Sequence, residues 1–592
     1  MIMRLALALL LTTALPALDH PAFAGQAPGA AETPDAPVSS RDRFYTSDQF
    51  SNTVSVINPA SNTLLGVIRL GDPTPGNLSP LYRGQLLVHG MGFSPDHRTL
   101  LVVSIGSNSV SFIDTATNAV KHTAYVGRSP HEAFYTPDGR EVWVSIRGEN
   151  GIVVLDAQTY KETARIEVPN GPGMTIFSPD GAYAYVCSSF SPETVVVSTK
   201  DRTIVGRVKQ DSPFSPDIAA TPDGKQVWLT LKDVGRTMVF DARPPFAVQT
   251  VLNTGPITNH VNIARTAAGQ FAYVTVGGLN QVKVFRTDGF TQVAAIPVGA
   301  MPHGLWPSGD GSRVYVGLEN ADGAAVIDTA QNKVIATIPL GQGPQGVAYV
   351  PGAVPEGPGT QNLQPLGAAG NLTQLTLGSP DGAGAAQVTL FDQGLVQVLQ
   401  AAVTGLEPKQ PYVLALATDA TGGGTLQPLA AFMSNPAGAA VVNAIGPLRK
   451  AVQGGEVTGV TMSLAVLALL CITAGTLYQK RFLAPCDVRS ASVVQLGAAL
   501  IVTLPFAMLE SEAIQWNLHS IGALGWSVLA LTLGGSSLLY ILIQRGTATA
   551  VTSLLYLVPP CTAVMAWLLF DEPITAVTVA GIALTAIGVS LV

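Results

Sequence analysis

The chain has 592 residues, of which 47% are hydrophobic and only 12% are charged, and its formal net charge is -7. This length exceeds what a single hydrophobic core usually supports, so several domains are expected. The charged fraction is about half that of an average soluble domain, which predicts that part of the chain lies in a lipid bilayer. No basic run is present, so nothing indicates a nucleic-acid partner.

Residues 1–24 have the pattern of a secretory signal peptide. Arg4 precedes the apolar run LALALLLTTALPAL, and an Ala-x-Ala pattern ends at Ala24. An uncleaved anchor helix is the alternative, but the run is short and Pro16 interrupts it. We therefore expect cleavage after Ala24 and export of the propeller region. Residues 25–42 are rich in Ala, Pro, Gly and Ser, which is typical of a linker.

Residues 43–352 repeat a unit of four short strands. The unit is clearest over Arg128–Val168, where β-branched and aromatic runs are separated by Gly, Pro, Asp and Asn. A Pro-Asp-Gly turn or a variant of it recurs every 42 to 45 residues, which gives six complete units from Leu86 to Leu340. Three N-terminal strands and the run Gln345–Pro351 complete a seventh. The pattern predicts an all-β, seven-bladed propeller closed by strands from its two ends.

This repeat resembles the YVTN-type, YncE-like β-propeller family. The name-giving tetrapeptide stands at Tyr273-Val274-Thr275-Val276, beside the Pro-Asp-Gly turns and the strands that end in Ile-Asp-Thr. The resemblance implies a secreted binding scaffold. It does not imply a particular activity, because one fold carries many functions.

Polar side chains share one position near the start of the innermost strands, at the mouth of the ring. Counting back eight residues from the last residue of each turn gives a column: His89, His131, Gly173, Pro216, Val261 and His303, with Gln345 in the closing strand and His260 one residue out of phase. Ring closure places His303, Gln345, His89 and His131 on four adjacent blades. Converging imidazoles could bind copper or zinc, with His89, His131 and His303 as the ligands.

Two alternatives stay open for this column. It could form a pocket for a small molecule or a peptide, or its histidines could only hydrogen-bond neighbouring loops. No Ser-His-Asp order, nucleotide-binding loop or paired-carboxylate pattern is present in the sequence. The sequence therefore favours a binding protein over an enzyme.

Residues 353–456 read as a linker followed by a small β-sandwich. A stretch rich in Gly and Pro precedes six short apolar runs, which are separated by Gly, Pro and Asn. The segment holds no His or Cys. We assign it no chemistry and interpret it as a spacer.

Residues 457–592 contain five apolar stretches that predict an all-α bundle of five transmembrane helices. They are Gly459–Tyr478, Ala491–Leu509, Ile521–Ile543, Thr549–Phe570 and Ile574–Val592, each about as long as a bilayer span of roughly 20 residues. The basic loop residues Lys480, Arg481, Arg489 and Arg545 all fall on one side of this bundle. The positive-inside rule then places the propeller on the periplasmic side of the inner cell membrane and the C-terminus in the cytoplasm.

This C-terminal stretch resembles the second half of an EamA-family protein of the drug/metabolite transporter superfamily. The resemblance rests on Leu477–Arg481, on Pro559-Pro560 and on Phe570-Asp571-Glu572-Pro573. It implies Glu572 and Pro559 as transport residues. Full members have ten helices in two inverted halves. A second copy of this chain would have the same orientation, so a transporter would need a separate N-terminal half.

Three functions are consistent with these features. The first is a membrane-anchored extracytoplasmic propeller that binds a small molecule or a protein at its mouth. The second is a component of a small-metabolite transporter, and the third is a metal-dependent redox propeller. The missing helices count against the second, and the lack of a catalytic constellation counts against the third, so the first is favoured.

Overall fold

The fold is described from a computed structural model of the chain. It describes residues 37–71, 86–367, 372–378, 384–393, 396–418 and 424–448, and isolated residues between 494 and 583. The chain divides into two compact units, Met1–Arg449 and Lys450–Val592. The predicted signal peptide, and the candidate transport residues Glu572 and Pro559, lie outside the described residues.

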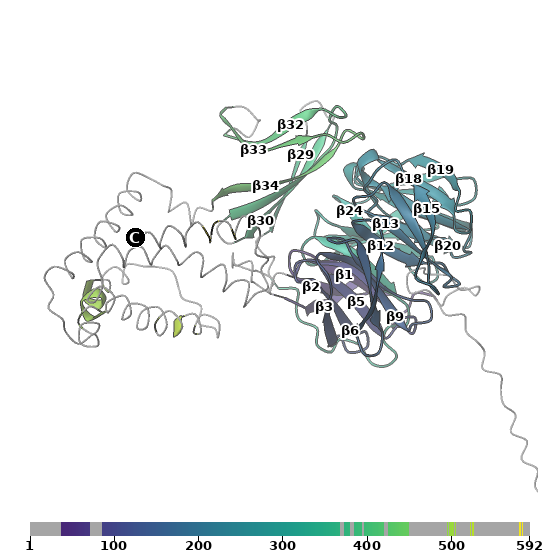
Figure 1. The fold of residues 1–592 in the computed structure, drawn as a ribbon, viewed down its shortest axis with the longest axis horizontal. Coiled ribbons are helices and arrows are strands. Elements are labelled where there is room, and N and C mark those ends of the chain that lie inside the picture. The colour runs from purple at the N-terminus through teal and green to yellow at the C-terminus, as the bar shows by residue number, and fades with distance from the viewer. Residues whose placement is uncertain are drawn as a thin grey trace, which may run out of the picture. The chain divides into compact units, whose positions relative to one another are not determined.

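Within the described residues, strands β1 to β28 form seven four-stranded antiparallel sheets, the blades of a propeller (Figure 1). Blade 1 is β4 Val88–Phe93, β5 Thr99–Ser104, β6 Ser109–Asp114 and β7 Val120–Tyr125. Blade 2 is β8 Pro130–Tyr135, β9 Glu141–Ile146, β10 Gly151–Asp156 and β11 Glu162–Glu167. Blade 3 is β12 Pro172–Phe177, β13 Tyr183–Ser188, β14 Glu193–Ser198 and β15 Ile204–Lys209.

Blades 4 to 6 continue the same order from the innermost strand to the outermost. Blade 4 is β16 Ile218–Ala220, β17 Gln226–Leu231, β18 Arg236–Asp241 and β19 Val248–Asn253, with the 3-10 turn η1 Lys232–Val234 after β17. Blade 5 is β20 Thr258–Thr266, β21 Gly269–Val276, β22 Gln281–Arg286 and β23 Gln292–Pro297, with η2 Gly277–Leu279 after β21. Blade 6 is β24 Pro302–Pro307, β25 Arg313–Leu318, β26 Gly323–Asp328 and β27 Lys333–Pro339.

Blade 7 joins the two ends of the ring, as the sequence predicts. It consists of β28 Pro344–Val350, β1 Arg43–Asp48, β2 Thr53–Asn58 and β3 Thr63–Arg69. β1 pairs antiparallel with β28, with Phe44 opposite Tyr349. This pairing removes the exposed sheet edges that an open ring would leave.

The core lies between the faces of neighbouring blades. The second strand of most blades carries one fully buried aromatic side chain at the same place: Trp143, Tyr185, Trp228, Tyr273 and Tyr315. Trp143 packs edge-on against Phe177 of the next blade, with ring centroids 5.2 Å apart. Each such ring buries about 150–250 Å² of surface, so these positions hold the blades together. The outermost strands, such as β11, are mostly exposed.

The segment after the ring forms the antiparallel strands that the sequence predicts. β29 Leu372–Gly378, β30 Ala385–Gln393, β31 Val396–Val403 and β34 Ala440–Leu448 make one sheet, and β32 Pro411–Ala417 pairs with β33 Leu426–Met433. Its small core contains Val388, Leu399, Ala401 and Ala444. Side chains of this segment contact the ring, since Gln374 Nε2 donates to the Glu319 carbonyl at 3.0 Å.

In the second unit, residues 494, 496–502 and 504 are helical. Among the described residues, no helix is both long and apolar enough to cross a bilayer. The five-helix bundle stays a prediction.

Candidate functional site: a polar cavity at the ring mouth

The structure brings the predicted column together at the mouth of the ring. His89, His131, His303 and Gln345 each occupy the second position of an innermost strand, in β4, β8, β24 and β28. All four side chains are buried. Together with His260 they line a cavity of about 450 Å³. This volume is in the range of small-molecule sites, which is about 300–1,000 Å³.

The register of blade 5 corrects one member of the column. Thr258 of β20 pairs with Val276, as Pro302 of β24 pairs with Leu318. The counterpart of His303 is therefore Asn259, and Val261 lies two residues further along. The β20–β21 hairpin has longer arms than the other hairpins of this kind, so counting back from the turn overshoots. His260 is then one residue beyond the column position.

Column side chains bond to the backbone of the next blade, as the loop-bonding alternative predicts. His131 Nδ1 lies 3.0 Å from the Gly173 carbonyl oxygen, and His303 Nδ1 lies 3.2 Å from that of Gln345. A carbonyl oxygen only accepts hydrogen bonds, so in a neutral imidazole each Nδ1 carries the proton. These backbone contacts thus use Nδ1 of His131 and of His303, and they leave Nε2 of both rings as a hydrogen-bond acceptor.

A second layer lies one residue further along each repeat and holds two buried acids outside the predicted column, Glu132 in β8 and Asp217 just before β16. Glu132 accepts a hydrogen bond from the Met91 N–H at 3.1 Å. Asp217 accepts one from the Val261 N–H at 2.7 Å. Its other oxygen lies 3.5 Å from His260 Nδ1. Shifting the column by one residue in each repeat would have found both acids.

The glycine at position 90 makes room for Glu132. A side chain there would overlap the Glu132 carboxylate and the His131 carbonyl oxygen. The same second-layer position holds glycine in two other blades, at Gly304 and Gly346. The polar side chains of the second layer therefore come from the blades that do not have glycine at this position.

Burial dominates the protonation of this site. It lowers the pKa of His89, His131 and His260 well below the usual histidine range, and it lowers that of His303 to about 3. It raises the pKa of Asp217 to about 8 and that of Glu132 well above its usual range. At neutral pH the imidazoles are therefore neutral and hold unprotonated nitrogens that can bind a ligand or a metal.

Two cationic side chains also line the cavity. The Arg147 guanidinium carbon lies 5.6 Å from the centre of the Phe214 ring, and Lys232 Nζ lies 5.8 Å from it. In the described part of the chain, no carboxylate lies within ion-pair distance of either cation. The acids Asp233 and Glu319 also line the cavity, and burial raises the pKa of both.

The segment after the ring contributes to the same cavity. Its lining includes four polar side chains from β30, β31 and β34: Gln387, Thr389, Gln400 and Asn443. The sequence alone gave no reason to assign this segment any chemistry. The contacts show that it supplies hydrogen-bonding groups to the mouth of the ring.

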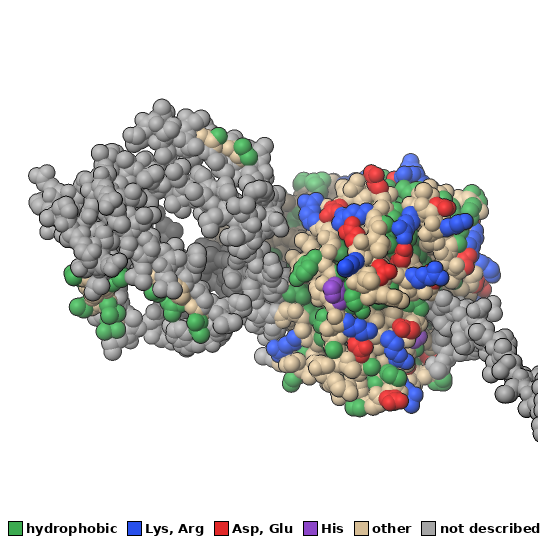
Figure 2. Space-filling model, turned by 60° about the horizontal axis from the view of Figure 1, so that its bottom comes forward, with side chains coloured by type: hydrophobic (Ala, Val, Ile, Leu, Met, Phe, Trp, Pro, Cys, Tyr) green, Lys and Arg blue, Asp and Glu red, His purple; other side chains and the backbone are tan. Residues whose placement is uncertain are grey.

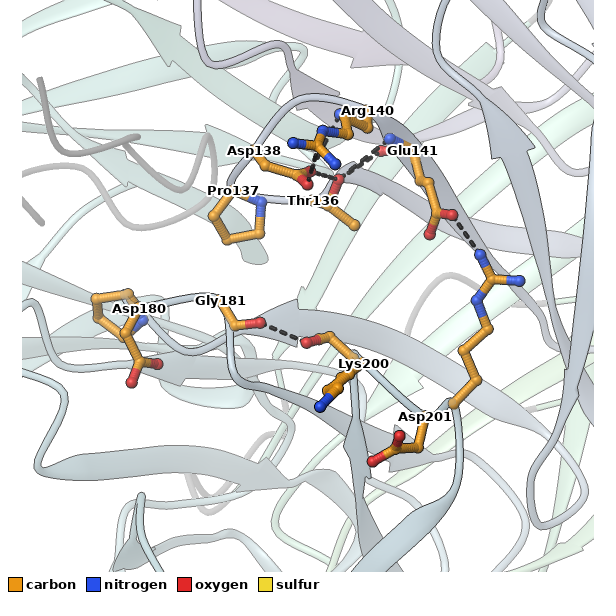
Figure 3. Close-up of a pocket in the computed structure, with 12 residues that line it drawn as sticks. Thr136, Pro137, Asp138, Arg140, Glu141, Asp180, Gly181, Lys200 and Asp201 are labelled. Atoms are coloured by element: carbon orange, nitrogen blue, oxygen red, sulfur yellow. Dashed lines mark hydrogen bonds and ion pairs between the residues drawn. The ribbon is translucent and has the colours of Figure 1, made fainter. Parts of the chain in front are cut away.

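A second, more open cleft of about 750 Å³ lies at the opposite ends of the innermost strands, between the turns of blades 2 and 3 (Figure 3). Several of its polar groups bond to one another. Thr136 Oγ1 donates to Asp138 at 2.6 Å, and Arg202 pairs with Glu141. Figure 2 shows acidic and basic side chains interspersed over the visible face of the ring. The cleft is therefore a seam between blades, and we assign it no chemistry.

The profile of the YNCE-like beta-propellers matches residues 3–354, more than half of the chain. The chain belongs to the YNCE-like beta-propeller family. The profile of the EamA-like transporter family matches residues 459–592. The protein thus joins a YNCE-like propeller to a transporter-like C-terminal part, which marks it as membrane-associated.

Two solved structures are similar to the YNCE-like ring. Hydrazine synthase from Kuenenia stuttgartiensis is 19% identical over 54% of this chain and 94% of its own, with a TM-score of 0.40. A functionally unknown protein from Desulfotomaculum acetoxidans DSM 771 is 14% identical over 52% of this chain and 98% of its own, with a TM-score of 0.45. A comparison with curated proteins found no match.

Proposed function

We propose that this protein is a membrane-anchored, extracytoplasmic binding protein whose propeller captures a small polar molecule with an acidic group. The observation that carries the proposal is the polar cavity of about 450 Å³ at the ring mouth. It contains two cations, Arg147 and Lys232, and no carboxylate of the described residues lies within ion-pair distance of either. Binding sites of this size typically combine enclosure with a few polar groups that fix the ligand.

The charges of the cavity favour an anionic group on the ligand. Arginine stays protonated even when burial lowers its pKa, as it does at Arg147. Its guanidinium can bind a carboxylate or phosphate through two parallel hydrogen bonds. Burial also favours the neutral form of Glu319, so this acid repels an anion less than an exposed carboxylate would. The neutral imidazoles and the Gln345 amide can hydrogen-bond the rest of the ligand.

The proposed location rests on the N-terminal pattern of residues 1–24, on the loop charges and on the EamA match. Export would place the ring outside the cytoplasm, and the C-terminal part would hold it at the membrane. The helices then need only to anchor the ring, so this function does not require a second transporter half.

The test is a calorimetric titration of the full chain in detergent with inorganic phosphate and with succinate. We expect at least one of the two anions to bind. The double variant Arg147→Gln/Lys232→Gln should bind it at least roughly 100-fold more weakly, because it removes two charge-assisted contacts and each contributes about 1.5–3 kcal/mol. The matched control is Arg207→Gln/Lys209→Gln, which removes two exposed cations from blade 3. Failure of both anions to bind, or equal binding by the two double variants, would refute the proposal.

The EamA match favours transport as a second candidate function. Five apolar stretches in the matched residues 459–592 predict one five-helix half, so transport would require a partner half. The test is co-purification of the full chain with the product of any adjacent gene that encodes a five-helix EamA-like half. A stable complex would support transport, and absence of a complex on co-expression would count against it.

A further inference from the structure

Two histidines that line the mouth cavity and an acid from the layer below them form a buried group of three metal-ligating side chains. His89 Nε2 and His131 Nε2 lie 2.9 Å apart. A ligand atom of Glu132 lies within 4.8 Å of both imidazoles, and all three side chains are buried. Two imidazole nitrogens and one carboxylate oxygen are a ligand set that divalent first-row transition metals use in proteins.

The hydrogen bonds of the two imidazole rings show which of their nitrogens carry protons. The Gly173 carbonyl holds the proton of His131 on Nδ1, so His131 Nε2 is an acceptor. A hydrogen bond between the rings then requires the proton of His89 on Nε2. This leaves His89 Nδ1 as a buried acceptor, and the described residues offer it no hydrogen-bond partner. No backbone acceptor therefore fixes the tautomer of His89, and its Nε2 lone pair can bind a metal once the proton moves to Nδ1.

The Glu132 carboxylate is also poorly compensated. It accepts a hydrogen bond from the Met91 N–H, and no basic side chain of the described residues lies within ion-pair distance of it. A buried carboxylate usually needs a cationic partner or a metal.

A cation between these groups would bind the Nε2 lone pairs of both rings, in place of the one proton they share, together with an oxygen of Glu132. We propose that His89, His131 and Glu132 bind one divalent first-row transition-metal ion. His131 already has the second contact that metal-bound histidines typically make, since its Nδ1 faces a backbone carbonyl. Of the histidines predicted from sequence as ligands, His303 lies outside this trio, with its ring centroid 6.0 Å from that of His89.

The spacing of the two nitrogens indicates the class of metal. With metal–nitrogen bonds of about 2.0–2.1 Å, nitrogens 2.9 Å apart subtend an angle of roughly 90° at the ion. Right angles belong to octahedral and tetragonal sites, which favours Cu²⁺ or Ni²⁺ over tetrahedral Zn²⁺. The inference deepens the proposed function, because an open coordination position could hold the acidic group of the ligand. Metal binding itself does not need that ligand.

The experiment uses the full chain in detergent, purified without a histidine tag and stripped of metal with a chelator. Calorimetry with Cu²⁺, Ni²⁺ and Zn²⁺ should show one ion per chain, with copper or nickel bound most tightly. The electron paramagnetic resonance spectrum of the copper form should show coupling to imidazole nitrogens. His131→Asn and Glu132→Gln should each weaken copper binding at least roughly tenfold. The control His122→Asn removes an exposed histidine on β7 and should change nothing.

Glu132→Gln keeps an oxygen that can accept the Met91 hydrogen bond, so it preserves the fold even if His131→Asn does not. Absence of stoichiometric binding in the unmutated chain would overturn the inference. Equal copper affinity in Glu132→Gln and the unmutated chain would also overturn it. If copper binds but phosphate and succinate do not, the metal site stands and the proposed function fails. If an anion binds but no metal does, only the metal site fails.

Discussion

Replacing Asp48 by Asn should remove a pH dependence of stability that arises where the ring closes. Asp48 is fully buried at the end of β1. Its carboxylate accepts hydrogen bonds from the hydroxyls of Thr46 at 2.7 Å, Ser55 at 2.7 Å and Thr53 at 3.0 Å. Burial outweighs these bonds and raises the pKa of Asp48 from 3.8 to about 7.

Whether stability rises or falls with pH depends on which state, folded or unfolded, holds the proton of Asp48 more tightly. Between about pH 4 and pH 7 the folded chain keeps a proton on Asp48 that the unfolded chain has released. The free energy of unfolding therefore falls as pH rises through this window, and it is level above pH 7. One pKa unit corresponds to about 1.4 kcal/mol, so this group alone lowers the free energy of unfolding by about 2–3 kcal/mol between pH 5 and pH 8.

Asparagine cannot ionise, so in the variant this position does not lower the free energy of unfolding as the pH rises. At pH 5 the two proteins should differ by less than about 1 kcal/mol, because the folded wild-type carboxyl is then protonated and resembles an amide. At pH 8 Asp48→Asn should be more stable by about 2–3 kcal/mol. The assay is urea unfolding of the full chain, followed by tryptophan fluorescence at several pH values. Other buried acids titrate alike in both proteins. A difference between variant and wild type that is constant from pH 5 to pH 8 would refute the reasoning.

Two further substitutions test other contacts of the ring. Gly90→Ala should destabilise the fold by about 1–3 kcal/mol in thermal or urea unfolding, because its methyl group would overlap the Glu132 carboxylate. Gly378→Ala, which has open space around it, is the matched control, and equal effects at the two sites would contradict the geometry. Tyr349→Phe should cost about 1–3 kcal/mol in urea unfolding, since its buried hydroxyl donates to Asp42 at 2.6 Å. A loss below about 0.5 kcal/mol would show that this bond does not stabilise the closure.

The architecture of the ring could be predicted because every blade repeats the same local chemistry. The Pro-Asp-Gly turns mark the period, and the two incomplete ends can only complete each other. The same logic placed His89, His131, His303 and Gln345 at one level. These positions depend on strand register alone.

The rest of the site depends on features that the period does not carry. The prediction of Val261 as a column member was wrong. The β20–β21 hairpin has longer strands but a turn like the others, so a fixed count back from the turn reaches the wrong residue. Glu132 and Asp217 were missed because they lie one layer below the predicted column. The polar side chains of the segment after the ring, such as Gln387, reach the cavity through tertiary docking. Docking of this kind leaves no periodic signal in the sequence.

The most direct test of the central claim is to locate a bound anion in a crystal structure of the full chain. Selenate is a tetrahedral dianion like phosphate, and selenium gives an anomalous signal that marks its position. We expect a selenate ion in the mouth cavity, within hydrogen-bond distance of Arg147 and Lys232. Selenate bound only elsewhere, for example at Lys200 in the cleft between blades 2 and 3, would contradict it.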